Sequence, residues 1–492
     1  MSDVIRIADP DFAHVRDEER EPFAEPPRAA APASDEDAPF GHGEHGGPGR
    51  PSLLLRLTAG VAVAGAVALT LLLAAGIGGA GDLVTALTGG LLGTWWGLLL
   101  GLVLPSAAAS VWFYETWRRR PAGVRNEGTF FRGMSSRGLG AWLVGVALTA
   151  FYVALYWYPQ VIHDAGLVAL VDPLARWLTG YPADQWFVYT VLYSAVVAVF
   201  GVRMAMRYRH SRYHLVRTAS VVVAQVGLAF VLPKLLVRMQ QPEFYPTYFW
   251  PLKRDVLLPG DYGMNWTATE AAGQVGIWML VFAGAMTFLA TPVLTWFYGK
   301  RWYCSWVCGC GGLAETLGDP WRHLSDKSTR AWWIEKILVH AVLVWIVLLT
   351  GALWLNHVQG GALLGGAGPG LERTYGFVIG SLFAGVAGVG FYPLLGTRVW
   401  CRFGCPMAAI LGILQRYLSR FRITTNGGQC ISCGNCSTYC EMGIDVKAYA
   451  QRGENIVRAS CVGCGVCAEV CPRGVLKLEN GPSVLGEERR SS

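Results

Sequence analysis

Long apolar stretches recur along most of this sequence and constrain the fold more than any other feature. A membrane-spanning helix needs about 20 predominantly apolar residues. The sequence predicts eight such helices, at residues 53–80, 83–114, 139–160, 185–207, 214–237, 272–298, 334–356 and 374–395. A single run of this kind could be a buried core helix, but only 15% of all residues are charged, against about 25% in soluble globular proteins. We therefore expect an α-helical polytopic membrane protein and exclude a soluble enzyme, a disordered chain and a collagen-like fibre.

The composition divides the chain into four regions. Residues 1–50 are rich in Pro, Ala, Gly and acidic residues, so we expect a disordered acidic tail. Residues 51–240 should form a membrane region of five helices. Residues 241–422 should hold helices six to eight together with a duplicated cysteine motif. Residues 423–492 should form a ferredoxin-like domain with a short tail.

The charge of the loops predicts the orientation. The loops after the second, fourth, sixth and eighth predicted helices are rich in Arg and Lys, whereas the intervening loops have few basic residues or balance them with acids. Basic loops stay in the cytoplasm. All 13 cysteines lie between Cys304 and Cys471, on the basic side, where thiols remain reduced. We expect a multi-pass protein of the bacterial inner membrane, with both termini and all cysteines on the cytoplasmic side.

The C-terminal region carries two cysteine runs with the same C-x2-C-x2-C-x3-C spacing, the second followed by Pro472. This is the bacterial ferredoxin run, in which the fourth cysteine of each run binds the other cluster. The spacing predicts one [4Fe–4S] cluster on Cys430, Cys433, Cys436 and Cys471, and a second on Cys461, Cys464, Cys467 and Cys440. Zinc is the competing ligand, but zinc sites usually pair two C-x2-C units across a longer gap. Glu441 stands where proline follows in the second run, and we expect it to alter only the local turn.

A second cysteine motif, G-x-R-x-[YW]-C-x3-C-[GP], occurs twice at an offset of 97 residues. It places Cys304 and Cys308 after the sixth helix, and Cys401 and Cys405 after the eighth. We expect the four thiols to form one site at the cytoplasmic membrane face, as redox-active dithiols or as ligands of a further metal or cluster. The alternative is that they are small buried apolar residues. Cys310 corresponds to Met407 in the second copy and is not assigned as a ligand.

The duplicated motif followed by two ferredoxin runs resembles the membrane-bound polyferredoxins, over roughly residues 272–475. These include the quinol-oxidising membrane subunit of periplasmic nitrate reductase, the regulatory or maturation protein of nitrous-oxide reductase, and the accessory protein of cbb3-type oxidase assembly. The resemblance implies electron transfer between quinone and a partner redox enzyme. The chain departs from the family in one motif, where Gly309 replaces proline. A flavin-bearing domain cannot be assigned.

We therefore expect a membrane-bound iron–sulfur protein that passes single electrons between quinone or a cytoplasmic donor and a partner redox enzyme. It would serve as the electron-transfer component of an oxidoreductase system. The alternative is an assembly factor that handles or reduces copper or iron for a respiratory metalloenzyme. The sequence offers no motif for nucleotide binding, and no nucleic-acid partner is expected. The aromatic loop at 242–262 is expected to be an interfacial belt or a docking surface on the outer side.

Overall fold

The structure is a computed structural model that describes residues 52–120, 122–123, 138–253 and 274–481. The expected disordered tail at residues 1–50 lies outside the described residues, as do most of the first basic loop and the second half of the aromatic loop. The residues from Leu53 onward belong to one compact unit. The sections below concern this unit.

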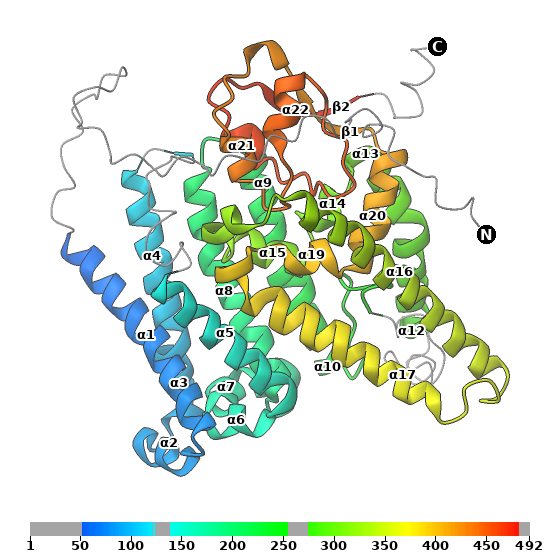
Figure 1. Cartoon of the computed structure of the whole chain (residues 1–492). Coiled ribbons are helices and arrows are strands. Elements are labelled where there is room, and N and C mark those ends of the chain that lie inside the picture. Colours follow the sequence, from blue (N-terminus) through cyan, green and yellow to red (C-terminus); the bar gives the residue numbers. More distant parts are fainter. Residues whose placement is uncertain (1–51, 121, 124–137, 254–273, 482–492) are drawn as a thin grey trace. The chain divides into compact units, whose positions relative to one another are not determined.

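Seven of the described helices are long and apolar enough to span a membrane, which agrees with the predicted class of polytopic helical protein. They are Leu53–Ile77 (α1), Trp95–Arg119 (α3 Trp95–Leu98, η4 Leu99–Val103 and α4 Leu104–Arg119), Leu139–Trp157 (α5), Gln185–Arg207 (α8), Arg212–Arg238 (α9 Arg212–Val222, η7 Val223–Val231 and α10 Leu232–Arg238), Val275–Tyr298 (within α12 Gln274–Ala285, η9 Met286–Ala290 and α13 Thr291–Tyr298) and Thr329–Val358 (α16). Figure 1 shows these long helices together with the shorter elements that connect them.

The eighth predicted helix is present as a helical run but is not among the seven. It consists of α17 (Ala367–Tyr375) and η11 (Gly376–Gly390), followed by the short α18 (Tyr392–Leu395). Its many glycines and the charged Glu372 and Arg373 lower its mean hydropathy. The run nevertheless carries the chain back along the bundle. The chain leaves Ser328 along α16, and Gly396 lies directly against Ser325 again.

Two groups of short elements connect the long helices. The first group consists of α2 (Gly81–Thr88), η3 (Leu91–Gly93), α6 (Pro159–Asp164) and α7 (Leu167–Thr179). The second group carries the duplicated cysteine motif and consists of α14 (Arg301–Cys304), α15 (Gly309–Glu315), η10 (Asp319–Leu324), α19 (Val399–Phe403) and α20 (Pro406–Tyr417). Polar caps begin three of the membrane helices, because Thr94 accepts from the N–H of Gly97 at 3.2 Å, Asp184 from that of Phe187 at 2.8 Å and Ser328 from that of Ala331 at 3.2 Å.

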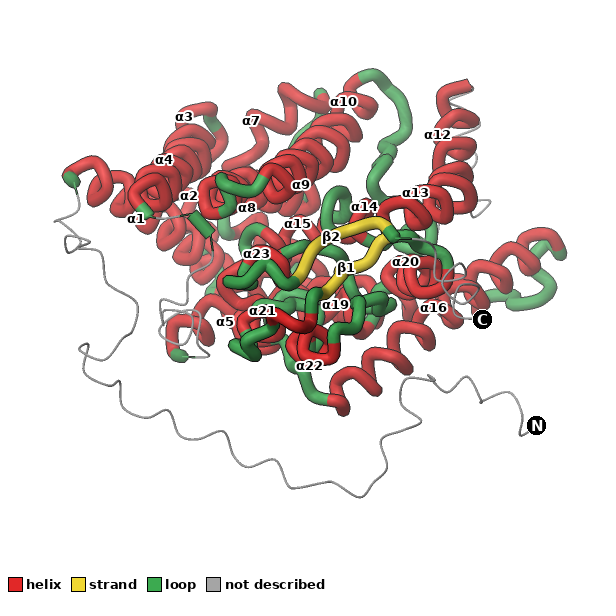
Figure 2. The backbone as a smooth tube through the Cα atoms, turned by 90° about the horizontal axis from the view of Figure 1, so that it is seen from above, coloured by secondary structure: helices red, strands yellow, loops and turns green. Residues whose placement is uncertain are grey.

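The C-terminal region has the predicted α+β character. Strand β1 (Phe421–Thr425) pairs antiparallel with β2 (Leu476–Asn480), so that Phe421 is opposite Asn480. Between the strands lie α21 (Asn435–Thr438), α22 (Val446–Arg452) and α23 (Val466–Glu469), together with η12 (Gly427–Gln429). Figure 1 shows the two strands with α21 and α22 at the top of the molecule, and Figure 2 looks down on them from above.

The ferredoxin region is hydrogen-bonded to one membrane helix and to the two segments that carry the duplicated motif. Tyr213 of α9 donates to the carbonyl of Gly463 at 2.7 Å, Ser305 to that of Val462 at 2.8 Å, and Gln415 of α20 to that of Cys461 at 2.8 Å. These contacts come from three separate parts of the membrane region. They therefore hold the second cysteine run at a defined position against the bundle.

Candidate iron–sulfur sites

The ferredoxin region contains a cavity lined by cysteines from both runs. Four of its lining residues are Cys430, Cys433, Cys436 and Cys471. This is the set expected from the crossed ligand pattern, with three cysteines from one run and the fourth from the other. Gly434 begins α21 with φ of 77°, a left-handed conformation that lets the chain turn closely around the cavity.

The remaining four cysteines of the two runs also come together. Burial raises the pKa of the Cys467 thiol well above its usual range, and the neighbouring thiols of Cys464, Cys461 and Cys440 raise it further. Cys440, from the first run, therefore lies close to the cysteines of the second run. The fourth cysteines of the two runs have equivalent surroundings, because Sγ of Cys440 accepts from the N–H of Ile444 and Sγ of Cys471 from that of Val475, each at 3.4 Å.

The buried thiols suit an iron–sulfur cluster. Burial raises the pKa of Cys436 and of Cys461 to about 11, because a thiolate is poorly solvated there. Metal binding deprotonates such thiols and removes this penalty. The donor set in each group consists of four sulfur atoms with backbone N–H groups nearby, which is the set that a [4Fe–4S] cluster requires.

The duplicated motif forms a third group of thiols. Cys304, Cys308, Cys401 and Cys405 are all at most 8% exposed and belong to one cluster of buried side chains. Burial raises the pKa of Cys405 well above its usual range, and the thiols of Cys401, Cys308 and Cys304 add to the effect. The two copies of the motif, predicted to act as one unit, therefore meet in what we call the four-thiol site.

In each copy of the motif, one short helix precedes the second cysteine and another begins directly after it. Cys304 ends α14 and Cys401 lies in α19, while Cys308 and Cys405 are the N-cap residues of α15 and α20. Pro406 follows as the first residue of α20, where the missing N–H costs nothing. Gly309 occupies the same position in α15, so the departure from proline leaves the local fold of the motif intact.

Cys310, which was not assigned from the repeat, also lies at this site. A hydrogen bond with the Cys310 side chain lowers the pKa of the Cys308 thiol to about 7, although burial acts in the opposite direction. The site therefore contains a fifth thiol. Its position three residues after Val307 could not be read from the repeat, because Met407 stands at the equivalent place.

Contacts with two of the long helices show how the four-thiol site packs against the bundle. The carbonyl of Val307 accepts from Nε2 of Gln225, and the carbonyl of Gly309 accepts from the hydroxyl of Tyr193 at 2.8 Å. Gln225 is the central residue of the 27-residue helix Arg212–Arg238, roughly 20 Å from either end at 1.5 Å per residue. The residues on both sides of Cys308 thus lie beside the middle of the helices Gln185–Arg207 and Arg212–Arg238, whereas Ser305 of the same motif contacts the ferredoxin region. The motif sequence alone carries no information about these contacts.

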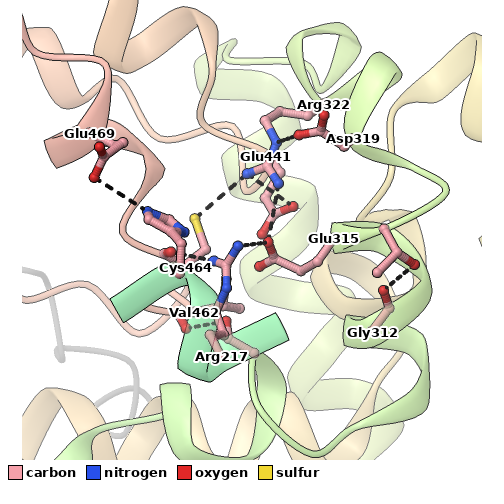
Figure 3. Close-up of polar contacts among 12 residues, drawn as sticks. Arg217, Gly312, Glu315, Asp319, Arg322, Glu441, Val462, Cys464 and Glu469 are labelled. Carbon is pink, nitrogen blue, oxygen red and sulfur yellow. Dashed lines mark hydrogen bonds and ion pairs between the residues drawn. The ribbon is translucent and has the colours of Figure 1, made fainter. Parts of the chain in front are cut away.

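Buried charges surround the carboxylate of Glu315 on α15. It forms ion pairs with Arg217 of α9 at 2.9 Å, Arg322 of η10 at 3.1 Å and Arg398 at 2.9 Å, and all four side chains are at most 3% exposed. Figure 3 shows Arg217 and Arg322 directed towards Glu315 and Cys464. Nη1 of Arg322 is 3.8 Å from Sγ of Cys464, so positive charge lies directly beside an expected cluster ligand.

Glu441 joins the same network, which corrects the expectation that it alters only a turn. It pairs with Arg398 at 2.8 Å and with Arg322 at 3.5 Å, and its side chain is completely buried. Arg398 also donates to the carbonyl of Cys304 at 3.2 Å and lies 3.8 Å from Sγ of Cys401. The carboxylates of Glu441 and Glu315 and the thiol of Cys464 approach within 4.8 Å of one another. Because guanidinium groups already pair with both carboxylates, we do not assign a cation there.

The fold and these sites define a multi-pass membrane protein with ferredoxin-type [4Fe–4S] domains. The family described as 4Fe-4S dicluster domain matches residues 429–476. The family described as 4Fe-4S binding domain matches twice, at residues 280–329 and 377–425, so that each match contains one copy of the duplicated motif. Together with the relatives described next, these matches show that the chain is similar to membrane-bound ferredoxin-type proteins, which agrees with the resemblance noted from the sequence.

Three relatives illustrate the similarity. The putative electron transport protein YccM of Escherichia coli is 27% identical over 35% of this chain and 50% of its own length. The methylamine utilization ferredoxin-type protein MauN of Paracoccus denitrificans is 27% identical over 39% of this chain and 71% of its own length. The ferredoxin-type protein NapH of Escherichia coli is 30% identical over 29% of this chain and 48% of its own length. The chain spans about half the length of the first relatives it matches. No solved structure matches it.

Proposed function

We propose that the chain is a membrane-bound electron-transfer protein with three iron–sulfur centres. Two [4Fe–4S] clusters would be held by the crossed sets Cys430, Cys433, Cys436 and Cys471, and Cys461, Cys464, Cys467 and Cys440. A third centre would be held by the four-thiol site. The observation that carries this proposal is the meeting of two matched 4Fe-4S binding segments at four buried thiols.

A [4Fe–4S] cluster accepts and donates one electron at a time. The membrane helices would set the distance between the second ferredoxin cluster and the third centre. Along α9 and η7, Arg217 holds the carbonyl of Cys464 and Gln225 holds that of Val307. These two helix positions are eight residues apart, or about 12 Å at the rise of an α-helix. Arg398, which contacts Cys304 and Cys401, and Glu441, which follows Cys440, form a buried ion pair that would lie between the centres.

The expected position of the ferredoxin region suggests the electron donor, and the names of the relatives suggest the kind of electron acceptor. The ferredoxin region would lie in the cytoplasm, where the basic loops are expected, and would accept electrons from a soluble donor or from quinone at the membrane. The partner would be a redox enzyme, by analogy with relatives whose names refer to methylamine utilization and ferredoxin-type proteins.

A second candidate function is the handling or reduction of copper or iron for a metalloenzyme under assembly. One observation favours it. Cys310 adds a fifth thiol that is hydrogen-bonded to Cys308, so the group holds one thiol more than a centre with four ligands needs. A thiol that is not a cluster ligand would bind soft metal ions or attack a disulfide as its thiolate.

Metal analysis of the anaerobically purified full chain tests both functions. Three [4Fe–4S] clusters require about 12 iron and 12 sulfide ions per chain, and two require about eight of each. The quadruple serine variant of the four-thiol site should lose only the third centre and retain the two ferredoxin EPR signals. Zinc in place of iron would contradict the proposal. Stoichiometric copper at the four-thiol site, with eight irons elsewhere, would favour the assembly function.

A further inference from the structure

A network of buried ion pairs adjoins the second cysteine run of the ferredoxin region. It joins five arginines to three carboxylates, with side chains that are all at most 10% exposed: Arg203, Arg207, Arg217, Arg322 and Arg398, and Glu315, Asp319 and Glu441. We call this group the arginine network. Arg322 lies at its centre, because it pairs with all three carboxylates, at 3.1, 3.3 and 3.5 Å.

The arginine network carries more positive than negative charge. Five guanidinium groups stand against three carboxylates, which leaves an excess of at least two positive charges. A buried charge without a counter-charge is costly. An oxidised [4Fe–4S] cluster with its four thiolates carries about two negative charges. A cluster held by Cys461, Cys464, Cys467 and Cys440 would therefore offset the excess, so the network and the second ferredoxin cluster suit one another electrostatically.

Two arginines of the network reach Cys464 directly. Nη1 of Arg322 lies 3.8 Å from Sγ of Cys464, and Nη1 of Arg217 donates to the carbonyl of the same residue (Figure 3). Both arginine side chains are 1% exposed. Burial raises the pKa of the Cys464 thiol, the nearby carboxylates raise it further, and the two arginines lower it. The charges of the network therefore act on this sulfur with little screening by water and salt.

The first set of cluster ligands has different surroundings. Its Cys433 is exposed, and the two basic residues that line its cavity are Lys447, which is partly buried, and Arg473, which is exposed. Water and dissolved ions screen charges at such a surface. Removal of one positive charge should therefore affect the second cluster much more than the first.

We infer that Arg322, supported by Arg217, sets the reduction potential of the second ferredoxin cluster. The inference rests on the proposed function, which assigns a cluster to this site. Reduction adds one electron, supplied by the one-electron donor of that function, and no bond forms or breaks. Burial opposes the added negative charge, whereas a buried positive charge beside a ligand sulfur favours it. Arg322 is neither oxidised nor deprotonated, because a guanidinium stays charged in proteins.

A redox titration of the full chain, followed by EPR, tests this inference. The signal that the Cys464→Ser variant lacks identifies the second cluster. In Arg322→Gln, we expect the ratio of reduced to oxidised second cluster at a fixed solution potential to fall at least tenfold, a shift of about 59 mV to more negative potential. The first cluster should keep its potential. Arg322→Lys retains the charge and should restore the wild-type potential, and Arg473→Gln, at the exposed control position, should shift neither cluster comparably.

Arg217→Gln gives a second variant that removes a charge, and we expect a shift in the same direction. Iron and sulfide analysis shows whether each variant holds its clusters. A loaded second cluster with an unchanged potential in the glutamine variants would overturn the inference. So would an equal shift in Arg322→Lys, because geometry and not charge would then be responsible, and so would loss of the second cluster from both glutamine variants, because the arginines would then serve assembly. Absence of iron from the wild-type chain would instead overturn the proposed function.

Discussion

Arg398 and Glu441 form a fully buried ion pair, in which Nη2 of Arg398 lies 2.8 Å from Oε1 of Glu441. Glu441 directly follows Cys440, and Arg398 precedes Cys401 by three residues. Burial alone would raise the pKa of Glu441, but the guanidinium groups of Arg322 and Arg398 lower it to about 2. The carboxylate therefore stays ionised at physiological pH, and the pair links the ferredoxin region to the four-thiol site.

Replacing Glu441 with Gln should destabilise the attachment of the ferredoxin region. Removal of one partner from a buried ion pair costs about 3–5 kcal/mol, because the remaining charge is left uncompensated. Thermal unfolding and limited proteolysis of the purified protein measure the effect. Glu454→Gln is the matched control, since its pair with Arg452 is more than half exposed and should contribute about 0–1 kcal/mol. Equal stability of the two variants would contradict a structural role for Glu441.

Replacing Cys433 or Cys464 with Ser should remove one ferredoxin cluster in each case. The two residues belong to different crossed sets, so each variant should lose about four iron ions per chain and a different EPR signal. Iron analysis and EPR of the reduced variants measure this. Unchanged iron and spectra in both variants would show that the assignment of ligands is wrong.

The cysteines of the four-thiol site should behave as one unit. Single serine variants at Cys304, Cys308, Cys401 or Cys405 should lose as much activity as the quadruple variant, because groups within one site are not additive. Electron transfer and metal content are measured for each variant. Losses that simply add would indicate two independent thiol pairs. Cys310→Ser distinguishes a metal centre with four ligands, which would survive, from a function that needs the fifth thiol.

Reporter fusions should place the ends of the Arg212–Arg238 helical run on opposite sides of the membrane. A cytoplasm-active reporter fused after Gly481 and an export-active reporter fused after Gln240 should both be active, because the basic loops lie on the ferredoxin side. The same fusions with the reporters exchanged should be inactive and serve as controls. An exported signal from the fusion after Gly481 would reverse the proposed orientation.

Replacing Gly311 with Ala should disrupt the four-thiol site. A Cβ atom at Gly311 would lie 1.9 Å from the carbonyl oxygen of Cys304, so α14 and α15 of the first copy of the motif would have to move apart. Overpacking of this kind costs about 1–3 kcal/mol or more, and we expect loss of metal from this site only. Gly351→Ala in α16 is the control, since its Cβ would meet nothing within 4 Å. A melting temperature and iron content that match this control would contradict the close packing.

The features predicted correctly from the sequence are those that depend on residues close together in the chain. Runs of about 20 apolar residues predicted the long helices, because backbone groups in a membrane must be satisfied within the helix itself. The C-x2-C-x2-C-x3-C spacing predicted the iron–sulfur region. The offset of 97 residues predicted that Cys304, Cys308, Cys401 and Cys405 meet, and the structure brings them together.

Only the tertiary structure decided what surrounds the four-thiol site. Gln225 and Val307, Thr247 and Tyr303, and Arg398 and Glu441 are each more than 40 residues apart in the chain, and no local pattern links them. The described part of the aromatic loop, expected as an interfacial belt or docking surface, packs inwards against Tyr303. Glu441 looked like a simple replacement for proline, because a spacing rule describes turns and not the charges packed against them. Hydropathy and cysteine spacing are local properties, whereas burial and ion pairing depend on which distant segments pack together.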